Sequence, residues 1–382
     1  MKNILYTLVI VILASCTQQN GNNTDSLIHI DLSEVVEENT FASTLFSDIR
    51  VVPLETINGS LLSNIREIDI YNDMVYISDA LMSKILVFSI ENGKFLNALS
   101  KQGKGAGEYS MIDDFIIDDD NKTIEVLDKQ KREIHIYDIH NLEYITSIPF
   151  DLSFVYSFSK ANDYYYFQTN GSTNSINGKP VNHDLIAFNK KTNAYYALLS
   201  RNNFPDESQA WEFTTIFNEN KKGDVFISSA WSDTIYRINN HIIKPFIKVH
   251  SGKRGFPPTI NTSTFQEKMA YLESNNVTNK IHFYKLLMHN EDGYIVAYGK
   301  GYPPVTYYYI HLYSVPNNST FNVSKITCDF SAFSNQKIDV FKEDNGLVIS
   351  VLYPSEIEDK DLDSLGIAIT DNPILLIFTA NT

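Results

Sequence analysis

Cysteine is nearly absent from this chain of 382 residues, which contains only Cys16 and Cys328. Cys16 lies at the end of a leader segment, and if it is modified there, no disulfide can form within the chain. The fold therefore cannot depend on a disulfide, even in an oxidising compartment. Cys328 lies in an alternating run of polar and apolar residues, which predicts a buried strand residue rather than a reactive thiol.

Basic residues are also scarce. The chain has 31 Lys and Arg against 46 Asp and Glu, and its formal net charge is −15. An acidic surface argues against nucleic-acid binding and against docking on anionic lipid through protein charge. No apolar run after Cys16 is long enough for a transmembrane helix.

Local catalytic and metal-binding motifs are missing from the sequence. There is no Gly-x-Ser-x-Gly, and Gly103, Gly105 and Gly107 lack the spacing of a nucleotide-binding loop. The acidic run at 118–121 lacks the Glu that closes a calcium loop, and the nine His residues form no pair at helical metal-ligand spacing. We therefore predict no catalytic residues, no cofactor and no metal site. A metal held by single residues from distant parts of the chain would leave no local motif, so this alternative stays open.

The N-terminus has the pattern of an export signal. Lys2 is followed by an apolar run over residues 4–14 and by Leu-Ala-Ser-Cys, which ends at Cys16. This tetrapeptide resembles the lipobox of bacterial lipoproteins, in which Cys16 would carry the lipid. We expect a signal peptide over residues 1–15 and a lipidated N-terminus with a flexible tether over 16–40. The protein would then be exported and anchored to a bacterial membrane, with the outer membrane as the expected location, facing the periplasm or the exterior.

A pattern of two paired strands recurs three times along the chain. It consists of Val-Tyr-Ile-Ser-Asp at 75–79, Ile-Glu-Val-Leu-Asp at 124–128 and Val-Phe-Ile-Ser-Ser at 225–229, each followed six residues later by Ile. Alternating apolar residues, a polar turn and a second alternating run predict a repeated hairpin. The 23 Tyr and 23 Phe against two Trp also favour strands. Such repeats are typical of a β-propeller or a β-solenoid.

Six units of four strands account for the repeat. The first two, at 65–99 and 114–148, are regular, and the sixth is one strand short. The strand expected at 49–54 has no unit of its own, and Pro53 suits an outer edge strand. We expect it to complete the sixth unit and close the ring. The prediction is an all-β fold over residues 41–382, a six-bladed β-propeller of four-stranded antiparallel blades whose ring an N-terminal strand closes.

Two segments interrupt the repeat and are expected to be surface elaborations. Thr264 and Glu267 have the spacing of a capping box, which predicts a short helical insertion between blades four and five. Residues 355–372 form an acidic loop inside unit six.

A glycine-rich segment, Gln-Gly-Lys-Gly-Ala-Gly-Glu-Tyr at 102–109, joins the first two units. A crossover that needs unusual φ angles and close backbone approach accounts for its glycines. Together with the strands and Asp residues that follow, it resembles the NHL repeat, and more closely the bacterial six-bladed β-propeller lipoproteins of the NHL and TolB-like type. The match is good over residues 64–148, but the chain departs from the NHL pattern at 82–85 and 131–134. The resemblance implies a propeller of the cell envelope.

The loops that join the second and third strands of each unit should gather on one face of the ring. Trp231 and Tyr302 lie in these loops, with Lys84 and Arg132 nearby. Aromatic faces beside polar groups suit a sugar or a peptide, so these four are the candidate ligand-binding residues. The alternative is that Trp231 packs between blades and Tyr302 is an ordinary residue before a proline.

Two functions fit the sequence. The first is a lipid-anchored, non-enzymatic binding or scaffold protein for a glycan or protein partner of the cell envelope. The alternative is a propeller hydrolase or lyase, lactonase-like or NHL-like, with an axial metal. An enzyme requires carboxylate, His or Asn side chains that converge on the axis, whereas a binding module requires an exposed patch on the loop face.

Overall fold

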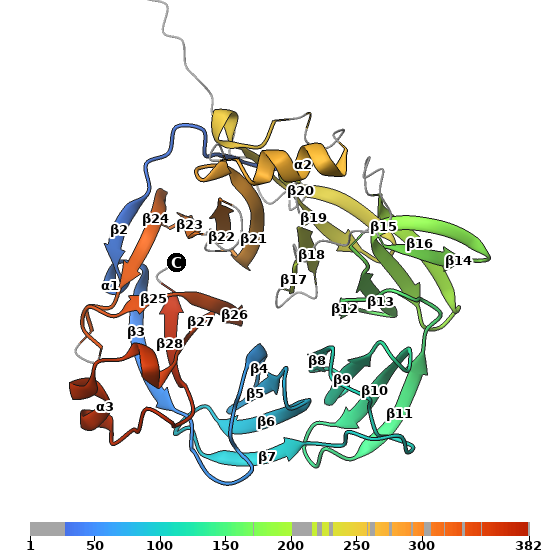
Figure 1. Ribbon diagram of the computed structural model, residues 1–382, viewed down its shortest axis with the longest axis horizontal. Coiled ribbons are helices and arrows are strands. Elements are labelled where there is room, and N and C mark those ends of the chain that lie inside the picture. The colour runs from blue at the N-terminus through green and yellow to red at the C-terminus, as the bar shows by residue number, and fades with distance from the viewer. Residues whose placement is uncertain are drawn as a thin grey trace, which may run out of the picture.

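The computed structural model describes residues 27–170, 172–200, 216–219, 224–228, 232–257, 259, 264–274, 277–291, 293–301, 307–316, 318–330, 333–344 and 346–380. Six sheets stand around a central axis, each built on four antiparallel strands (Figure 1). This confirms the predicted six-bladed β-propeller. The innermost strands are β4, β8, β12, β17, β21 and β26, and the chain moves outward through each blade.

The strands of the first three blades follow the predicted repeat. Blade one comprises β4 (Ile65–Tyr71), β5 (Met74–Asp79), β6 (Lys84–Ser89) and β7 (Phe95–Leu99). Blade two comprises β8 (Asp114–Asp118), β9 (Thr123–Asp128), β10 (Glu133–Asp138) and β11 (Tyr144–Pro149). Blade three comprises β12 (Ser157–Ala161), β13 (Tyr164–Gln168), β15 (Lys179–Asn189) and β16 (Ala194–Ser200), with β14 (Thr173–Ile176) paired to the extended start of β15.

The last three blades carry the additions to the basic pattern. Blade four comprises β17 (Ile216–Glu219), β18 (Val225–Ser228), β19 (Thr234–Asn239) and β20 (Ile242–His250). Blade five comprises β21 (Ile281–His289), β22 (Gly293–Lys300), β23 (Tyr307–Ser314) and β24 (Ser319–Thr327), with β25 (Lys337–Ile338) paired to β24. Blade six comprises β26 (Val340–Asp344), β27 (Leu347–Leu352), β28 (Ile374–Ala380) and β3 (Phe46–Pro53).

Tight turns between adjacent strands contain residues that tolerate a left-handed backbone. Asn72 has a φ of 52° between β4 and β5, and Asn162 has a φ of 55° between β12 and β13. Asn adopts this conformation at low cost, which is why Asn-Asp pairs mark these turns in the sequence. In the glycine-rich crossover, Gly107 has a φ of 72°, and a Cβ there would lie 2.5 Å from Cγ of Tyr144. Only glycine fits, as the crossover interpretation predicted.

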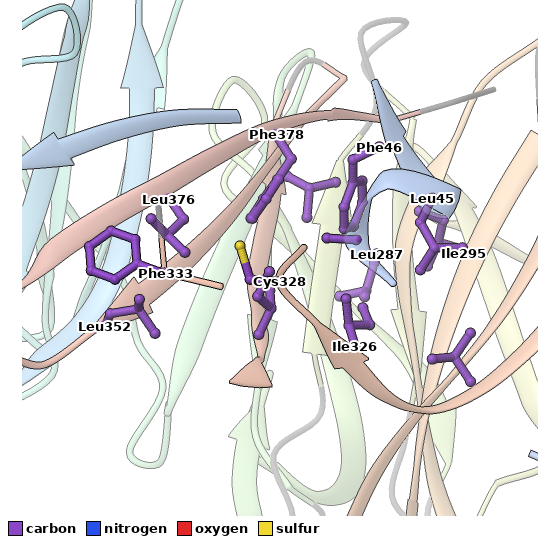
Figure 2. Packing of buried hydrophobic residues seen from close by; sticks show 14 of the residues in the cluster. Leu45, Phe46, Leu287, Ile295, Ile326, Cys328, Phe333, Leu352, Leu376 and Phe378 are labelled. Atoms are coloured by element: carbon purple, nitrogen blue, oxygen red, sulfur yellow. The ribbon is translucent and has the colours of Figure 1, made fainter. Parts of the chain in front are cut away.

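The ring closes where the sequence predicted. Strand β3 pairs antiparallel with β28, so that Pro53 faces Ile374 and Val51 faces Leu376 across the ladder. Side chains of blades five and six meet behind this joint, and the Phe46 and Phe378 rings stack with centroids 4.8 Å apart (Figure 2). Closure therefore combines a backbone ladder with an apolar core, and β3 covers the edge that β28 would otherwise expose.

Residues 28–40, which we expected to belong to the tether, contribute to two strands. Strand β1 (Ile28–Asp31) pairs parallel to β20, and β2 (Glu38–Phe41) pairs parallel to β24. Between them, the Glu37 carboxylate contacts Lys300 Nζ at 2.6 Å, the Tyr298 hydroxyl at 2.9 Å and Arg254. The N-terminal segment thus adds a fifth strand to the outer edge of blade four and another to that of blade five.

Three further segments differ from the expected pattern. The connection between β13 and β15 contains an additional strand, β14, which forms a hairpin with the start of β15. Strand β25 precedes β26 of blade six along the chain, but its Ile338 pairs with Ile326 of blade five. The acidic loop contains the short helix α3 (Asp359–Leu365), whose buried Leu362 belongs to the core of blades five and six.

The helix expected between blades four and five is present as α2 (Phe265–Leu272). The Thr264 N–H donates to Glu267 Oε2 at 2.8 Å, and the Glu267 N–H donates to Thr264 Oγ1 at 3.3 Å. These reciprocal bonds are the predicted capping box. Cys328 is also buried, directly after β24, and burial raises the pKa of its thiol.

Candidate functional site

One face of the ring carries the loops between second and third strands together with the crossovers that join blades. We call this the loop face. The two features share a face because strand direction alternates within a blade, so the fourth strand ends on the same side where the second strand ended. The turns between first and second strands, and between third and fourth, lie on the opposite face.

The repeated Asp at the end of the second strand organises the loop face. In blade one, Asp79 Oδ1 accepts the N–H groups of Leu81 and Met82 at 2.9 and 2.8 Å. Its Oδ2 accepts the N–H of Ser63 in the crossover that precedes the blade. Asp79 is buried, so these bonds replace water around the carboxylate and tie the loop to the crossover.

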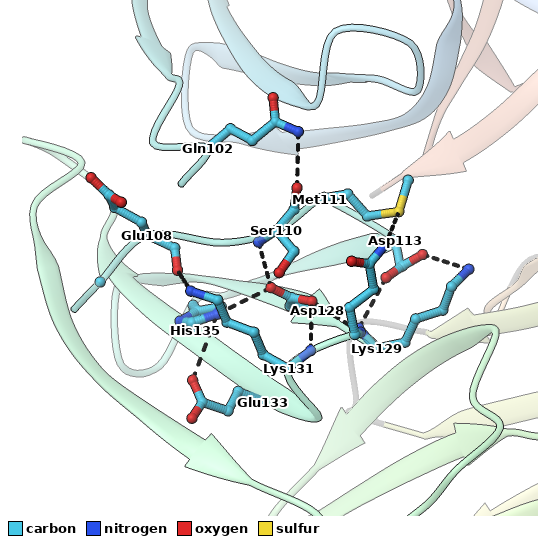
Figure 3. Close-up of polar contacts among 12 residues, drawn as sticks. Gln102, Glu108, Ser110, Met111, Asp113, Asp128, Lys129, Lys131, Glu133 and His135 are labelled. Atoms are coloured by element: carbon cyan, nitrogen blue, oxygen red, sulfur yellow. Dashed lines mark hydrogen bonds and ion pairs between the residues drawn. The ribbon is translucent and has the colours of Figure 1, made fainter. Parts of the chain in front are cut away.

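Asp128 repeats this arrangement in blade two (Figure 3). Its carboxylate accepts the N–H groups of Gln130 and Lys131, each at 3.0 Å, and that of Ser110 at 2.6 Å. His135 Nε2 lies 3.7 Å from Asp128 Oδ2. Burial alone would raise the pKa of Asp128, but the nearby His135 imidazole and the hydrogen bonds from Ser110 and Lys131 outweigh it, so the pKa is lowered. The Asp of the repeat therefore holds the loop and the preceding crossover together on the loop face.

Exposed apolar side chains are concentrated on the loop face where blades six and one meet. Seven of the fifteen large apolar side chains that are exposed in the described part of the chain lie on three neighbouring segments. The crossover 54–64, the loop 80–83 and the insertion 353–373 contribute them. Leu365 lies on α3, and we call the other six residues the apolar patch: Ile57, Leu61, Leu81, Met82, Tyr353 and Ile369.

Hydrogen bonds hold the three segments of the apolar patch against one another. Asn372 of the insertion accepts the Leu62 N–H at 2.9 Å and donates to the carbonyl oxygens of Glu55 and Ser60 at 2.8 and 2.9 Å. Partial burial raises the pKa of Tyr353, which also interacts with the backbone of Ile65 and the charge of Asp79. The crossover, the loop and the insertion therefore form one continuous surface.

The predicted ligand-binding residues are distributed unevenly over the structure. Lys84 lies at the apolar patch, where its Nζ donates to the Leu61 carbonyl at 2.8 Å. Arg132 lies in the corresponding loop of blade two, one residue before β10, with its guanidinium 3.8 Å from Asp151. Each cation contacts a different crossover, so the structure does not bring these two together. Cys16, Trp231 and Tyr302 lie outside the described residues.

The inner wall of the ring carries a second group of polar residues, which the sequence analysis did not identify. Lys342 on β26 lies 2.9 Å from Asp69 and 3.1 Å from Glu67, both on β4. The Ile117 N–H on β8 donates to Asp69 at 3.3 Å, and the Phe158 N–H on β12 donates to Asp114 at 3.0 Å. Carboxylates of one inner strand are thus bonded by the inner strand of the next blade.

Burial is the main cause of the pKa changes among the side chains of the inner wall. It raises the pKa of Asp114 to about 7, with a further contribution from the negative charge of Glu67. It also raises the pKa of Asp69, although Lys342 opposes this change, and it lowers the pKa of Lys285 on β21. The acids that are nearest the axis are therefore engaged by lysines and backbone N–H groups.

The described residues bear on the predicted metal site and on membrane-spanning helices. They contain no group of three or more His, Cys, Asp or Glu side chains placed to hold a metal ion. None of the helices that the structure describes is long and apolar enough to cross a membrane.

Comparison with known proteins shows the family and the fold. Residues 27–379 match the family model "Domain of unknown function (DUF4934)". A crystal structure of a Bacteroides fragilis NCTC 9343 protein inferred to be exported is similar at a TM-score of 0.70 and 19% identity, over 94% of this chain and 100% of that one. A member of the DUF4221 family from Bacteroides vulgatus ATCC 8482 is similar at a TM-score of 0.55 and 10% identity, over 88% of this chain and 97% of that one.

The search of curated proteins found no match. The family model begins at residue 27, one residue before β1, and ends inside β28, so it spans all six blades and the N-terminal strands. The chain is therefore a member of the DUF4934 family.

Proposed function

We propose that this protein is a lipid-anchored, non-enzymatic binding or scaffold protein of the cell envelope and that its partner docks on the loop face. The observation that carries the proposal is the apolar patch. Leu81 is 72% exposed and Met82 is 50% exposed, although the loop that holds them is fixed by the buried Asp79. Exposed apolar side chains on segments that hydrogen bonds hold together favour a partner, because their burial on binding is favourable and little order is lost.

The composition of the apolar patch favours a protein partner over a glycan. Five of its six side chains are aliphatic or thioether groups, and only Tyr353 is aromatic. Sugars bind best on aromatic faces flanked by polar groups, whereas aliphatic side chains pack well against other apolar side chains. We therefore propose a protein as the partner.

The direction of β1 supports a loop face that is accessible to a partner. Strand β20 ends at the loop face, and β1 runs parallel to it, from Ile28 beside Ile247 to Asp31 beside His250. Ile28, the first residue of β1, is therefore nearer the opposite face than Asp31. If Cys16 carries lipid, as the lipobox predicts, this direction favours a loop face that points away from the membrane. The likeness to a Bacteroides protein inferred to be exported and the NHL and TolB-like resemblance are compatible with this location.

The proposal can be tested by comparing how wild-type and variant proteins capture a partner from envelope extracts. Wild-type protein should retain a specific partner, and the double substitution Leu81→Asn with Met82→Asn should lose it. Ile242 is 53% exposed at the start of β20, on the opposite face, so Ile242→Asn is a matched control that should retain the partner. Equal capture by the double variant and the control would contradict a binding role for the loop face. Stoichiometric metal in purified protein would instead support the axial-metal enzyme.

A further inference from the structure

We propose that the docking site is selective for a cationic amphipathic segment of the partner protein, one that presents Lys or Arg beside a row of apolar side chains. This inference rests on the proposed function, because it specifies the chemistry of the segment that occupies the loop face. Two adjoining features carry it: the apolar patch and the acidic insertion 353–373, which we call the acidic border.

The acidic border belongs to the same continuous surface as the apolar patch. It begins at Tyr353 and contains Ile369, and Asn372 at its end binds the crossover through Leu62 and Ser60. Helix α3 is fixed on the protein by Leu362, which is 5% exposed within the core of blades five and six. The acidic side chains are thus displayed from an anchored element beside the apolar surface.

The charge of the acidic border is strongly one-sided. Its six acidic residues accompany a single cation, Lys360: Glu356, Glu358, Asp359, Asp361, Asp363 and Asp371. Lys360 pairs with Glu358 at 2.6 Å, both side chains being largely exposed, so this pair costs little to break. Asp359 and Asp363 are exposed. Lys84, the cation at the apolar patch, is engaged by the Leu61 carbonyl. A cationic segment would therefore experience attraction along one side of the patch.

A second copy of this chain fits the site less well. Every copy has a formal net charge of −15, and a symmetric dimer through the loop face would bring two acidic borders together. An acidic amphipathic segment is disfavoured for the same reason. An uncharged apolar segment would use the patch but would leave the acidic border without a role.

Defined peptides test this inference on the full chain in mild detergent. The probes are a fluorescent 14-residue peptide of Leu and Lys arranged as an amphipathic helix, and its counterpart with Glu in place of Lys. Fluorescence anisotropy should show binding of the Lys peptide and at least about tenfold weaker binding of the Glu peptide. Raising the ionic strength should weaken binding of the Lys peptide, because salt screens the attraction between exposed charges.

Three variants locate the site. The double variant Leu81→Asn with Met82→Asn should lower the affinity for the Lys peptide about tenfold or more. The triple variant Asp359→Asn with Asp361→Asn and Asp363→Asn should lower it to a similar extent. Ile242→Asn should leave its affinity unchanged. Thermal unfolding of each variant at wild-type temperature would show that the fold is retained.

The outcomes separate this inference from the proposed function. Equal affinity for the Lys and Glu peptides, or no loss in the two loop-face variants, would overturn the cationic selectivity. If the wild-type chain still captures a partner through the loop face, the proposed function survives that result. Sedimentation that shows a dimer broken by Leu81→Asn would assign the patch to a second copy and overturn the inference.

Discussion

Lys342 of the last blade lies 2.9 Å from Asp69 of the first blade, across the point where the ring closes. The same two blades are joined at their outer edge, where β3 from the N-terminal part of the chain completes blade six. Closure therefore has an outer backbone ladder and an inner ion pair. The inner pair is partly shielded from solvent, with 26% of the Lys342 side chain and 20% of the Asp69 side chain exposed.

Lys342→Met should lower the free energy of unfolding by about 1–2 kcal/mol, because Glu67 and Asp69 would remain at the inner wall without their cation. Chemical denaturation measures this loss. Lys360→Met is the matched control, since its pair with Glu358 is exposed, and it should change stability by less than about 0.5 kcal/mol. Equal effects of the two substitutions would show that the inner pair does not stabilise closure.

Asp114 gives the inner wall a pH dependence. Burial and Glu67 raise the pKa of this carboxyl to about 7, from 3.8 for the free group. The folded state therefore favours the protonated form, and stability present at acidic pH is lost progressively as the pH rises from about 4 to about 7. Asp114→Asn should remove this loss. The free energy of unfolding of the variant, relative to that of the wild type, should therefore rise by about 1–2 kcal/mol between pH 5 and pH 8. A difference that is constant with pH would contradict the raised pKa.

Asp79→Ala should destabilise the protein by about 2–3 kcal/mol, because three backbone N–H groups of the loop and crossover would lose their buried acceptor. Asp48→Ala provides the comparison, since the exposed Asp48 carboxylate bonds the adjacent Ile49 N–H. That change should cost less than about 0.5 kcal/mol in thermal or chemical unfolding. A loss of stability no larger than that of Asp48→Ala would mean that the repeated Asp does not hold the loop and the crossover together.

The sequence allowed prediction of the strands but not of the surfaces they build. Alternation identified the hairpins, and the spare strand with Pro53 led to the closed ring. The parallel strands β1 and β2 were missed, because short segments of mixed polarity give no strand pattern of their own. Glu67 and Lys342 are separated by 275 positions, so only the ring brings them together.

The apolar patch was beyond prediction for a similar reason. Leu81 and Met82 lie in a loop that was a candidate, but their exposure depends on the crossover and on the insertion nearly three hundred residues later. The clue in the sequence was a pair of large apolar residues inside a turn, where polar residues are usual. Charged residues on the first strands of units one, two and six were the corresponding clue to the inner wall.

Cys16→Ser tests the membrane anchor. The lipobox prediction requires the thiol of Cys16, so the substitution should move the exported protein from the membrane fraction to the soluble fraction. Fractionation followed by immunodetection measures this change. Cys328→Ser is the control that should leave the protein with the membrane. Membrane association of both variants would refute lipidation at Cys16.

The most direct test of the loop-face proposal is site-specific photo-crosslinking in living cells. A photoreactive phenylalanine analogue replaces Leu81 in one version of the full chain and Ile242 in another, so that two exposed apolar positions on opposite faces are compared. The account predicts a discrete crosslinked protein from position 81 and none from position 242. The same crosslink from both positions, or from position 242 alone, would contradict a binding function for the loop face.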